Sequence, residues 1–454
     1  MSATRFIQFL SGRNVGKTMH SAVSIAFIGT LFTGAVIAIA GSELPDLGGG
    51  ITSFALAVND KGDVVGRSYN TSFEEHATVW LAGGTPTDLG TLGGSKSEAK
   101  AVSSTGVIVG SSQLLDYSQH ATLWASATSA PIDLGTLGGF NSQASGVNVN
   151  NDVVGLSHVP DNSTLHATLW PATWPAANHA AVDLNPSGAA FSEAVAINGA
   201  GDIVGRSMDA NWVSQAILWT GPTHLAVALQ TLGGSQGHAF GINDKGDVVG
   251  ETQNTTGVWR PTLWAAPAHA PVDLGTPVVG SFGSATGINA AGDVVGYSGT
   301  ADGSKHGTLW QMASAAGSPS SCKLSASSKS QTRSRSENLR SDERRRAEER
   351  ERDRRWLGLA PSSPAPSAPA ASSLAPSSSA GSRTMLDLGI LVGLNSQAAS
   401  VNTSGKIVGF GDNAAAESRA MSWQAPAATL PPTVTPGRDH EGNHQNKGDE
   451  DGDC

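Results

Sequence analysis

The sequence is poor in cysteine, in charge and in aromatic residues other than tryptophan. Its 454 residues include two cysteines, Cys322 and Cys454, and charged residues make up 15% of the chain. Neither cysteine lies in the repeated segments described below, so no disulfide framework staples the predicted fold. The net charge is −10 and no basic stripe runs through the repeats, which argues against nucleic-acid binding.

Signatures of catalytic and metal sites are also scarce. The sequence has no His-Glu-x-x-His motif and no complete Gly-x-x-x-x-Gly-Lys-Ser/Thr phosphate loop. Three glycine-rich segments, residues 91–94, 136–139 and 231–234, lead into a strand pattern rather than a helix, which indicates tight connections. The sequence therefore predicts no catalytic residue, no metal site and no cofactor, and an enzyme is not the favoured interpretation.

The dominant feature of the sequence is one motif that is repeated seven times. Its clearest copies join Asp-Leu-Gly-Thr-Leu-Gly-Gly at residues 88–94 to His-Ala-Thr-Leu-Trp at residues 120–124, and repeat both at 133–139 and 166–170. The closing tryptophans recur every 44 to 49 residues, apart from the last interval. They are Trp80, Trp124, Trp170, Trp219, Trp264, Trp310 and Trp423. A period of this length indicates a repeat architecture.

Each repeat has the pattern of four short strands bounded by turn residues. In the first copy these strands are predicted at residues 53–59, 62–68, 76–80 and 88–90. An Asn-x-x-Gly or Asn-x-x-Asn turn joins the first two strands in six copies, because glycine and asparagine tolerate the positive φ of a bulged hairpin. These turns carry too few carboxylates to form a calcium loop.

Seven units of four strands predict an all-β, seven-bladed β-propeller with repeats of ~45 residues. The run of units opens with a lone fourth strand, residues 44–48, and ends at Trp423 without one. We therefore expect the N-terminal segment to supply the outer strand of the last blade and so close the ring. A solenoid would have no reason to split one unit between the two ends of the chain.

A paired substitution supports this alignment. Wherever the third strand begins with His or Arg, the fourth strand carries Asp, and in the one copy with Gln215 the partner position is Ala228. Losing both members together avoids leaving a buried polar group without a partner. The predicted structural pairs are His76–Asp88, His120–Asp133, His166–Asp183, Arg260–Asp273, His306–Asp387 and, across the closure, Arg419–Asp46.

Candidate binding residues lie at one mouth of the predicted channel. The position before the innermost alanine varies between copies and is polar in six of them: Phe54, Glu98, Gln143, Glu193, His238, Ser284 and Gln397. Trp212 and Trp259 lie outside the core register in adjacent blades, on the same predicted face. Together they suggest a surface that stacks a sugar or a peptide. The alternative is that both tryptophans pack under their own loops.

The remaining segments do not belong to the repeats. Residues 1–40 predict a signal peptide, with an uncleaved membrane anchor as the alternative, because an uncharged run at 21–40 follows Arg5, Arg13 and Lys17. Residues 41–317 hold repeats one to six and 384–425 hold repeat seven. The low-complexity stretch 318–383 predicts a disordered insertion, or out-of-frame translation that replaced an eighth repeat. The polar tail 426–454 contains His440 and His444 and is predicted to be disordered.

The whole pattern resembles the bacterial HAF-family repeat, described as a probable extracellular repeat. The match covers residues 44–312 and 385–424, with Thr at 78, 122 and 168 where the family name implies Phe. The resemblance implies location and repeat type and carries no established activity.

Three functional hypotheses remain open for this chain. The first is an exported, non-enzymatic scaffold that binds a glycan, a peptide or a surface partner, with membrane contact only if the N-terminal segment is uncleaved. The second is a propeller enzyme, such as a glycan hydrolase or lyase, that uses Glu98, Glu193 and His238. The third is a purely structural surface protein.

Overall fold

The computed structural model describes residues 41–172, 181–278, 281–312, 383–390 and 395–426. All of them belong to one compact unit, Ala38–Cys454. The predicted signal or anchor at 1–40, nearly all of the insertion at 318–383, both cysteines, and His440 and His444 of the tail lie outside the described residues. Within the residues that are described, no helix has the length and hydrophobicity needed to cross a membrane.

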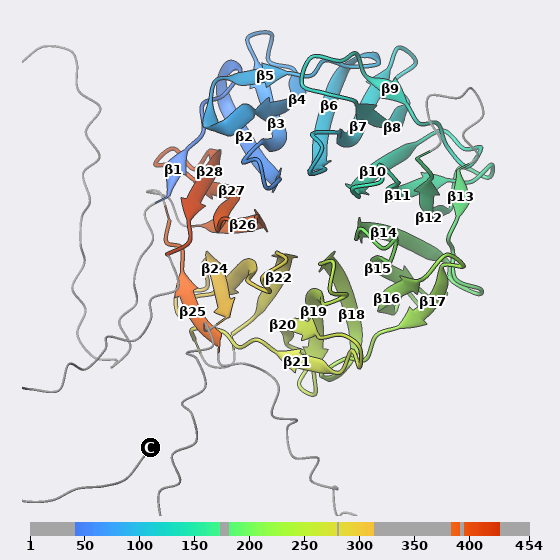
Figure 1. Ribbon diagram of the computed structural model, residues 1–454, viewed down its shortest axis with the longest axis vertical. Helices are drawn as coiled ribbons and strands as arrows, with labels where there is room; N and C mark the ends of the chain where they lie inside the picture. The colour runs from blue at the N-terminus through green and yellow to red at the C-terminus, as the bar shows by residue number, and fades with distance from the viewer. Residues whose placement is uncertain (1–40, 173–180, 279–280, 313–382, 391–394, 427–454) are drawn as a thin grey trace, which may run out of the picture. The chain divides into compact units, whose positions relative to one another are not determined.

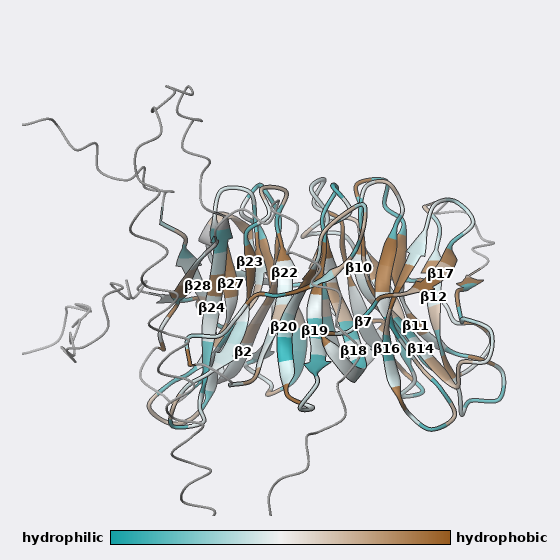
Figure 2. Ribbon diagram, turned by 90° about the horizontal axis from the view of Figure 1, so that it is seen from below, coloured by the Kyte–Doolittle hydropathy of each residue, from teal (hydrophilic) through white to brown (hydrophobic). Residues whose placement is uncertain are grey.

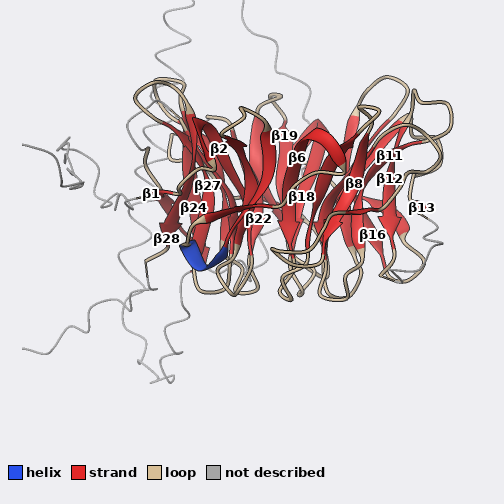
Figure 3. Cartoon of the chain, turned by 90° about the horizontal axis from the view of Figure 1, so that it is seen from above, coloured by secondary structure: helices blue, strands red, loops and turns tan. Residues whose placement is uncertain are grey.

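The described residues fold as an all-β propeller, as the sequence predicts. Seven four-stranded antiparallel sheets are arranged around a central axis, with one strand of each sheet innermost (Figure 1). Apolar segments run along many of the strands between the two rims (Figure 2). Beside the strands there is one short 3-10 turn, η2 (Leu81–Gly83), in the part of the chain that the structure describes (Figure 3).

The blades follow one another in sequence order, and the strands of each blade run in sequence order from the axis outward, except that β1 is the outermost strand of blade 7. Blades 1 to 3 are β2 (Gly48–Val58), β3 (Val64–Asn70), β4 (Glu75–Trp80), β5 (Pro86–Asp88); β6 (Gly93–Val102), β7 (Ile108–Leu114), β8 (Gln119–Trp124), β9 (Ile132–Asp133); and β10 (Ser142–Val147), β11 (Val153–His158), β12 (Leu165–Trp170), β13 (Val182–Asp183). Blades 4 and 5 are β14 (Phe191–Ile197), β15 (Ile203–Met208), β16 (Ser214–Thr220), β17 (Leu225–Ala228); and β18 (Gly233–Ile242), β19 (Val248–Asn254), β20 (Trp259–Trp264), β21 (Pro271–Asp273). Blades 6 and 7 are β22 (Gly283–Ile288), β23 (Val294–Gly299), β24 (Lys305–Met312), β25 (Arg383–Asp387); and β26 (Ser396–Val401), β27 (Lys406–Asp412), β28 (Ser418–Gln424), β1 (Ser42–Glu43).

The N-terminal strand closes the ring, but in a different register from the predicted one. Strand β1 pairs with β28, with Ser42 opposite Ser422 and Glu43 opposite Met421. In blade 1 the equivalent pair is Thr78 opposite Asp88. The closing strand is therefore Ser42–Glu43 rather than residues 44–48, and Glu43 occupies the strand position that aspartate fills elsewhere. The sequence prediction aligned Asp46 there because it matched residue type.

Two small residues set the spacing inside each blade. The inner strand of blade 1 has a β-bulge between Ala55 and Ala57, and Ala55 is fully buried. Gly66 lies opposite Ala55, and a Cβ added to it would lie 1.9 Å from the carbonyl oxygen of Phe54. The equivalent glycine of every other blade meets the same clash at 1.9–2.0 Å. The Val-Val-Gly phrase therefore ends in glycine because two backbones approach too closely for a side chain.

Tryptophans fill the space between neighbouring blades. Trp124 of blade 2 is fully buried and shares a cluster with Ala77 and Val79 of blade 1. Its indole N–H donates to the carbonyl oxygen of Leu89, 2.8 Å away, where the chain leaves blade 1. Burying such a side chain contributes roughly 4–6 kcal/mol as an upper estimate. The repeated tryptophan is thus a link between blades as well as a core residue.

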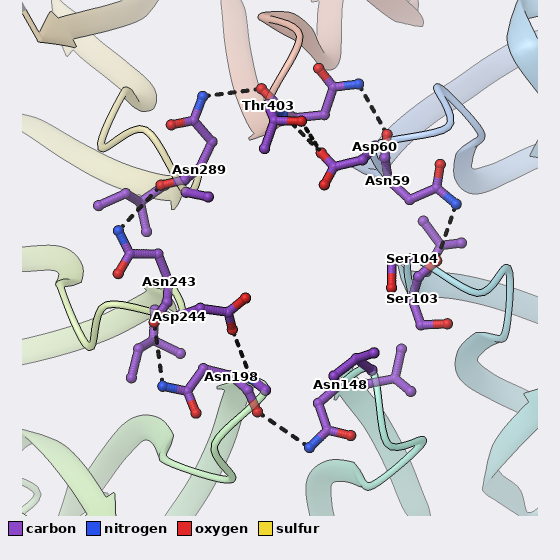
Figure 4. Close-up of a pocket in the computed structure, with 18 of the residues that line it drawn as sticks. Asn59, Asp60, Ser103, Ser104, Asn148, Asn198, Asn243, Asp244, Asn289 and Thr403 are labelled. Carbon is purple, nitrogen blue, oxygen red and sulfur yellow. Dashed lines mark hydrogen bonds between the residues drawn. The ribbon is translucent and has the colours of Figure 1, made fainter.

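In six of the seven blades, an asparagine at the end of the inner strand joins the blade to the next. In blade 1, Asn59 Oδ1 accepts the backbone N–H of Asp63. Its Nδ2 donates to Asp63 Oδ2 and to the carbonyl oxygen of Ser103 in blade 2, both at 3.1 Å. The same side-chain bridge, at 3.0–3.3 Å, is made by Asn148, Asn198, Asn243, Asn289 and Asn402. Figure 4 shows these bridges around the axis.

One junction among the described blades lacks this bridge. Ser103 occupies the asparagine position of blade 2, and its hydroxyl accepts the backbone N–H of Val107 at 3.1 Å. The turn is otherwise equivalent, because Gly106 has a φ of 99° as Gly62 of blade 1 has a φ of 86°. A serine side chain is too short to reach Asn148 of blade 3, so the ring of side-chain bridges is open at this point (Figure 4).

Exchanging the two residue types should move stability in opposite directions. Asn402→Ser removes the bridge to Asn59 across the ring closure, and Ser103→Asn supplies the missing bridge. We expect a loss and a gain of about 1 kcal/mol, respectively, the usual net value of one buried hydrogen bond. The denaturant midpoint of each variant measures this. A Ser103→Asn variant that is no more stable than the parent protein would contradict the bridging role.

Candidate functional site

The residues at the end of the central channel where the turn asparagines lie hold the blades together. A pocket of about 230 Å³ there is lined by residues of all seven blades. Its charged lining residues are Asp60 and Asp244. The Oδ1 atom of Asp60 accepts the backbone N–H and the hydroxyl of Thr403, and that of Asp244 accepts the N–H of Gly199 at 2.8 Å. Both carboxylates therefore tie one blade to its neighbour.

No metal site is evident in the described part of the chain. No group of three or more histidine, cysteine, aspartate or glutamate side chains there has a geometry that could hold an ion. The aspartates that follow the turns, such as Asp63, pair with the turn asparagine instead.

The opposite mouth carries the predicted binding positions, and we call it the variable mouth. Each of its seven inner-strand residues lies opposite one residue of the second strand of the same blade. The pairs are Phe54–Arg67, Glu98–Ser111, Gln143–Leu156, Glu193–Arg206, His238–Glu251, Ser284–Tyr297 and Gln397–Phe410. Glu and Gln each occur twice among the inner-strand residues and Arg twice among their partners, but no pair of residue types occurs twice, so the chemistry of this mouth varies around the ring.

The two candidate glutamates are paired with arginine. Glu98 Oε1 lies 2.8 Å from Arg67 Nη1 of the preceding blade, and that guanidinium also meets Glu75 at 2.8 Å. Glu193 Oε2 lies 2.9 Å from Arg206 Nη2 in its own blade. These carboxylates lie in separate blades, and each is already paired with an arginine.

The other variable positions make polar or aromatic contacts. Lys100 Nζ donates to Gln143 Oε1 at 2.7 Å, which links blades 2 and 3. The rings of Phe54 and Phe410 meet edge to face at 5.1 Å across the junction of blades 7 and 1. Gln397 lines a groove beside Phe410.

The two tryptophans outside the core register have different environments. Trp212 sits on the turn between β15 and β16 and is 67% exposed. Trp259 begins β20 and stacks on His238, with ring centroids 4.8 Å apart. His238 Nδ1 in turn lies 3.0 Å from Glu251 Oε1. His238 and Glu193 are thus each paired within their own blade rather than with each other.

All the expected side-chain pairs between third and fourth strands are in contact. The histidine Nδ1 atom lies 2.7 to 2.9 Å from an aspartate oxygen in the four pairs His76–Asp88, His120–Asp133, His166–Asp183 and His306–Asp387. Arg260 Nε lies 2.9 Å from Asp273 Oδ2. In blade 4, Gln215 and Ala228 instead line a hollow of about 250 Å³.

The pair across the closure combines two carboxylates. Arg419 Nη1 lies 3.0 Å from Asp46 Oδ2, and its Nε lies 3.6 Å from Glu43 Oε1. The guanidinium also meets Glu417 at 2.8 Å. Asp46 reaches Arg419 from the loop after the closing strand, whereas Glu43 holds the strand position itself.

In two of the histidine pairs, His76–Asp88 and His120–Asp133, the pKa values of both partners are shifted. The hydrogen bond to Asp88 raises the pKa of His76 above its ordinary 6.5, against the opposing effect of burial. Burial alone would raise the pKa of Asp88, but the hydrogen bonds from His76 and from the N–H of Gly90 lower it below 3.8. His120 and Asp133 shift in the same directions.

These shifts predict an optimum of stability in mildly acid solution. A raised histidine pKa contributes stability fully below pH 6.5, and that contribution disappears as the pH rises through the folded-state value. A lowered aspartate pKa contributes above pH 3.8 and is lost as the pH falls. Both contributions are present together between pH 3.8 and 6.5.

The double change His76→Gln with Asp88→Ala tests this, because it copies the pair already present in blade 4. We expect the denaturant midpoint of the parent protein to fall between pH 5.5 and pH 8.5, and to fall less in the variant. Partly exposed pairs contribute of the order of 0.2–1 kcal/mol each. An equal decrease of the denaturant midpoint in both proteins would show that this pair does not cause the pH dependence of stability. Glu74, which lies 3.8 Å from His76 Nε2, is kept in both proteins.

The structure also places two further exposed aromatic residues, Phe73 and Tyr117, at the same turn position as Trp212, and the sequence pattern did not single these two out. The third residue of the turn between second and third strands has a positive φ in all seven blades. It is Phe73, Tyr117, Asn162, Trp212, Gly257, Gly303 and Ala416. The three aromatic members are 66%, 79% and 67% exposed, respectively. Aligning the seven turns on Gly257 and Gly303 would have shown aromatic residues at a position that favours glycine, but the loops differ too much in sequence between copies to be aligned.

The chain matches no protein-family model and no curated protein. Among solved structures it is similar to TolB from Acinetobacter baumannii, with 12% identity, a TM-score of 0.39, and coverage of 56% of this chain and 61% of that one. It is similar to a puromycin-hydrolyzing peptidase of Mycobacterium tuberculosis, with 12% identity and a TM-score of 0.39, over 57% of this chain and 43% of that one.

A third similar structure is the BP39L lectin from Burkholderia pseudomallei, with 10% identity and a TM-score of 0.27. The similarity covers 55% of this chain and 79% of the lectin. The chain thus spans about three fifths of the TolB structure and less than half of the peptidase.

Proposed function

We propose that this chain is an exported HAF-type repeat propeller that acts as a non-enzymatic binding scaffold. Its ligand is a glycan, a peptide or a surface partner, and it binds at the variable mouth and the turns around it. The observation that carries the proposal is the division between the two ends of the blades. Residues that hold the ring recur in nearly every blade, whereas the pairs of residues at the variable mouth differ from blade to blade.

Exposure supports this assignment. The tryptophan, alanine and glycine positions of the framework are buried, and the turn asparagines are nearly so. The turns beside the variable mouth present Phe73, Tyr117 and Trp212 to solvent instead. Large exposed aromatic side chains near polar groups are typical of recognition surfaces rather than of inert ones.

A hydrolytic function has less support from the geometry. Glu98 and Glu193 are held by Arg67 and Arg206, and neither has the other carboxylate beside it as a glycosidase pair does. The segment 233–237 has the Gly-x-Ser-x-Gly spacing of a hydrolase, but it belongs to strand β18, and the hydroxyl of Ser235 donates to Gln253. A nucleophile elbow joins a strand to a helix.

Export is part of the proposal because of residues 1–40. Three basic residues, an uncharged run and the small residues Ala38 and Ala40 have the order of a signal peptide. A purely structural surface role is the remaining alternative, and it predicts that no soluble ligand binds.

We expect the purified chain to bind members of a glycan array or of a peptide array. The double variant Trp212→Ala with Trp259→Ala should lose part of that binding signal. No product should form in a hydrolysis screen. Turnover that disappears in Glu193→Gln would favour the enzyme alternative. No binding on either array would favour the purely structural role.

A further inference from the structure

Two grooves at the rim of the variable mouth are built by the same three residues. Residues 141–143 and 395–397 are both Asn-Ser-Gln, at the start of the inner strands of blades 3 and 7. The first triplet lines a groove of about 330 Å³ against blade 2, and the second lines one of about 300 Å³ against blade 6. We call these the Asn141 groove and the Asn395 groove. Both volumes fall at the small end of ligand pockets.

The asparagine has the same structural task in each groove. Asn141 Oδ1 accepts the backbone N–H of Gln119 at 2.9 Å, and Asn395 Oδ1 accepts that of Lys305 at 3.1 Å. One side-chain atom thus fixes the amide against the preceding blade. The Nδ2 group of Asn395 donates to Asp412 Oδ2, whereas within the described residues the Nδ2 group of Asn141 has no partner.

The Asn141 groove offers several further polar groups with unused hydrogen-bonding capacity. Gln119 donates through Nε2 to Ser111, and its Oε1 has no partner among the described residues. His158 lines the same groove, and its Nδ1 is buried without a partner in the described part of the chain. Leaving a buried polar atom such as His158 Nδ1 unpaired costs about 1–3 kcal/mol. Gln119 is exposed and Asn141 is partly exposed, so their unused amide atoms are accessible to another molecule.

The aromatic wall of this groove is held under strain. Tyr117 lines the groove, is 79% exposed and has a φ of 69°. Asp116 Oδ1 accepts the N–H and the hydroxyl of Ser118, which fixes the turn. A bulky residue in this backbone conformation costs of the order of 1–3 kcal/mol, and the turns of blades 5 and 6 avoid it with glycine. Strain kept at an exposed aromatic residue points to a function for the ring.

We propose that the Asn141 groove binds one sugar ring of a neutral saccharide, with the ring stacked on Tyr117 and adjacent hydroxyls paired with the amides of Asn141 and Gln119. This rests on the proposed binding function and names its ligand class. A hydroxyl both donates and accepts, as a primary amide does, so two amides match a vicinal diol. The aromatic face accepts the apolar face of the sugar.

A sugar fits this groove better than a peptide does. Extended peptides bind by adding a strand to an open sheet edge, which presents a row of free backbone groups. The grooves here are closed by side chains of two blades, and the outer strands β9 and β13 are two residues long. The Asn395 groove has no aromatic turn residue, because blade 6 carries Gly303 there, so it forms the weaker of two sites.

The sharpest test replaces the strained tyrosine in the full chain. The probes are methyl glycosides of glucose, galactose, mannose and N-acetylglucosamine, with a set of tetrapeptides for comparison, measured by saturation-transfer NMR and calorimetry. Tyr117→Gly should weaken glycoside binding at least tenfold and should not lower the denaturant midpoint, because glycine removes the strain. Ala416→Gly makes the same relief of strain at the equivalent turn position of blade 7, which lines neither groove, and should leave affinity within about twofold.

A second variant separates the amide from the fold. Asn141→Asp keeps the acceptor for the N–H of Gln119 and removes the donor, so binding should weaken without unfolding. Binding that survives Tyr117→Gly but is lost in the variant Trp212→Ala would overturn the groove assignment and leave the scaffold proposal standing. Tetrapeptide binding with no glycoside binding, or no response to any glycoside at about 20 mM, would also overturn it. Failure on both arrays would remove the scaffold proposal itself.

Discussion

The side-chain amide that joins six of the seven blades to the next is the interaction on which this ring depends. A ring of sheets needs contacts that repeat around the axis and span its closure, because one misplaced junction displaces all the others. The asparagine amide meets this need twice. Its oxygen caps the turn of its own blade, and its nitrogen bonds the backbone of the next blade. The same residue therefore fixes the local hairpin and the angle between blades.

Close packing inside each blade explains the rest of the repeated phrase. The bulge after the inner alanine brings one backbone oxygen within 2.0 Å of where a Cβ would stand at the opposing glycine, so that glycine admits no substitute. In five blades an inner-strand serine also accepts an N–H from the preceding blade, as Ser97 does from Ala77. Repetition in this sequence is thus a record of contacts between blades.

Much of this architecture is readable from the sequence, because periodic contacts leave periodic residues. The tryptophan spacing predicts the blades, and the paired change to Gln215 and Ala228 predicts the contact between third and fourth strands. The closing strand was placed wrongly because Asp46 matched the residue type while Glu43 matched the register, and a two-residue strand carries too little pattern to choose. The grooves were not predictable, since they depend on which side chains of two different blades face each other.

The same reasoning explains why recognition would sit on the turns around the variable mouth. Framework residues serve two blades at once, so changing one disturbs a junction. A residue at the tip of a turn, such as Tyr117, holds no junction between blades, and a glycine at that position would be less strained. An exposed aromatic side chain that the fold does not need, at a turn position whose positive φ favours glycine, has its explanation outside the fold. The Asn141 groove beside it supplies polar partners that the chain itself leaves unused.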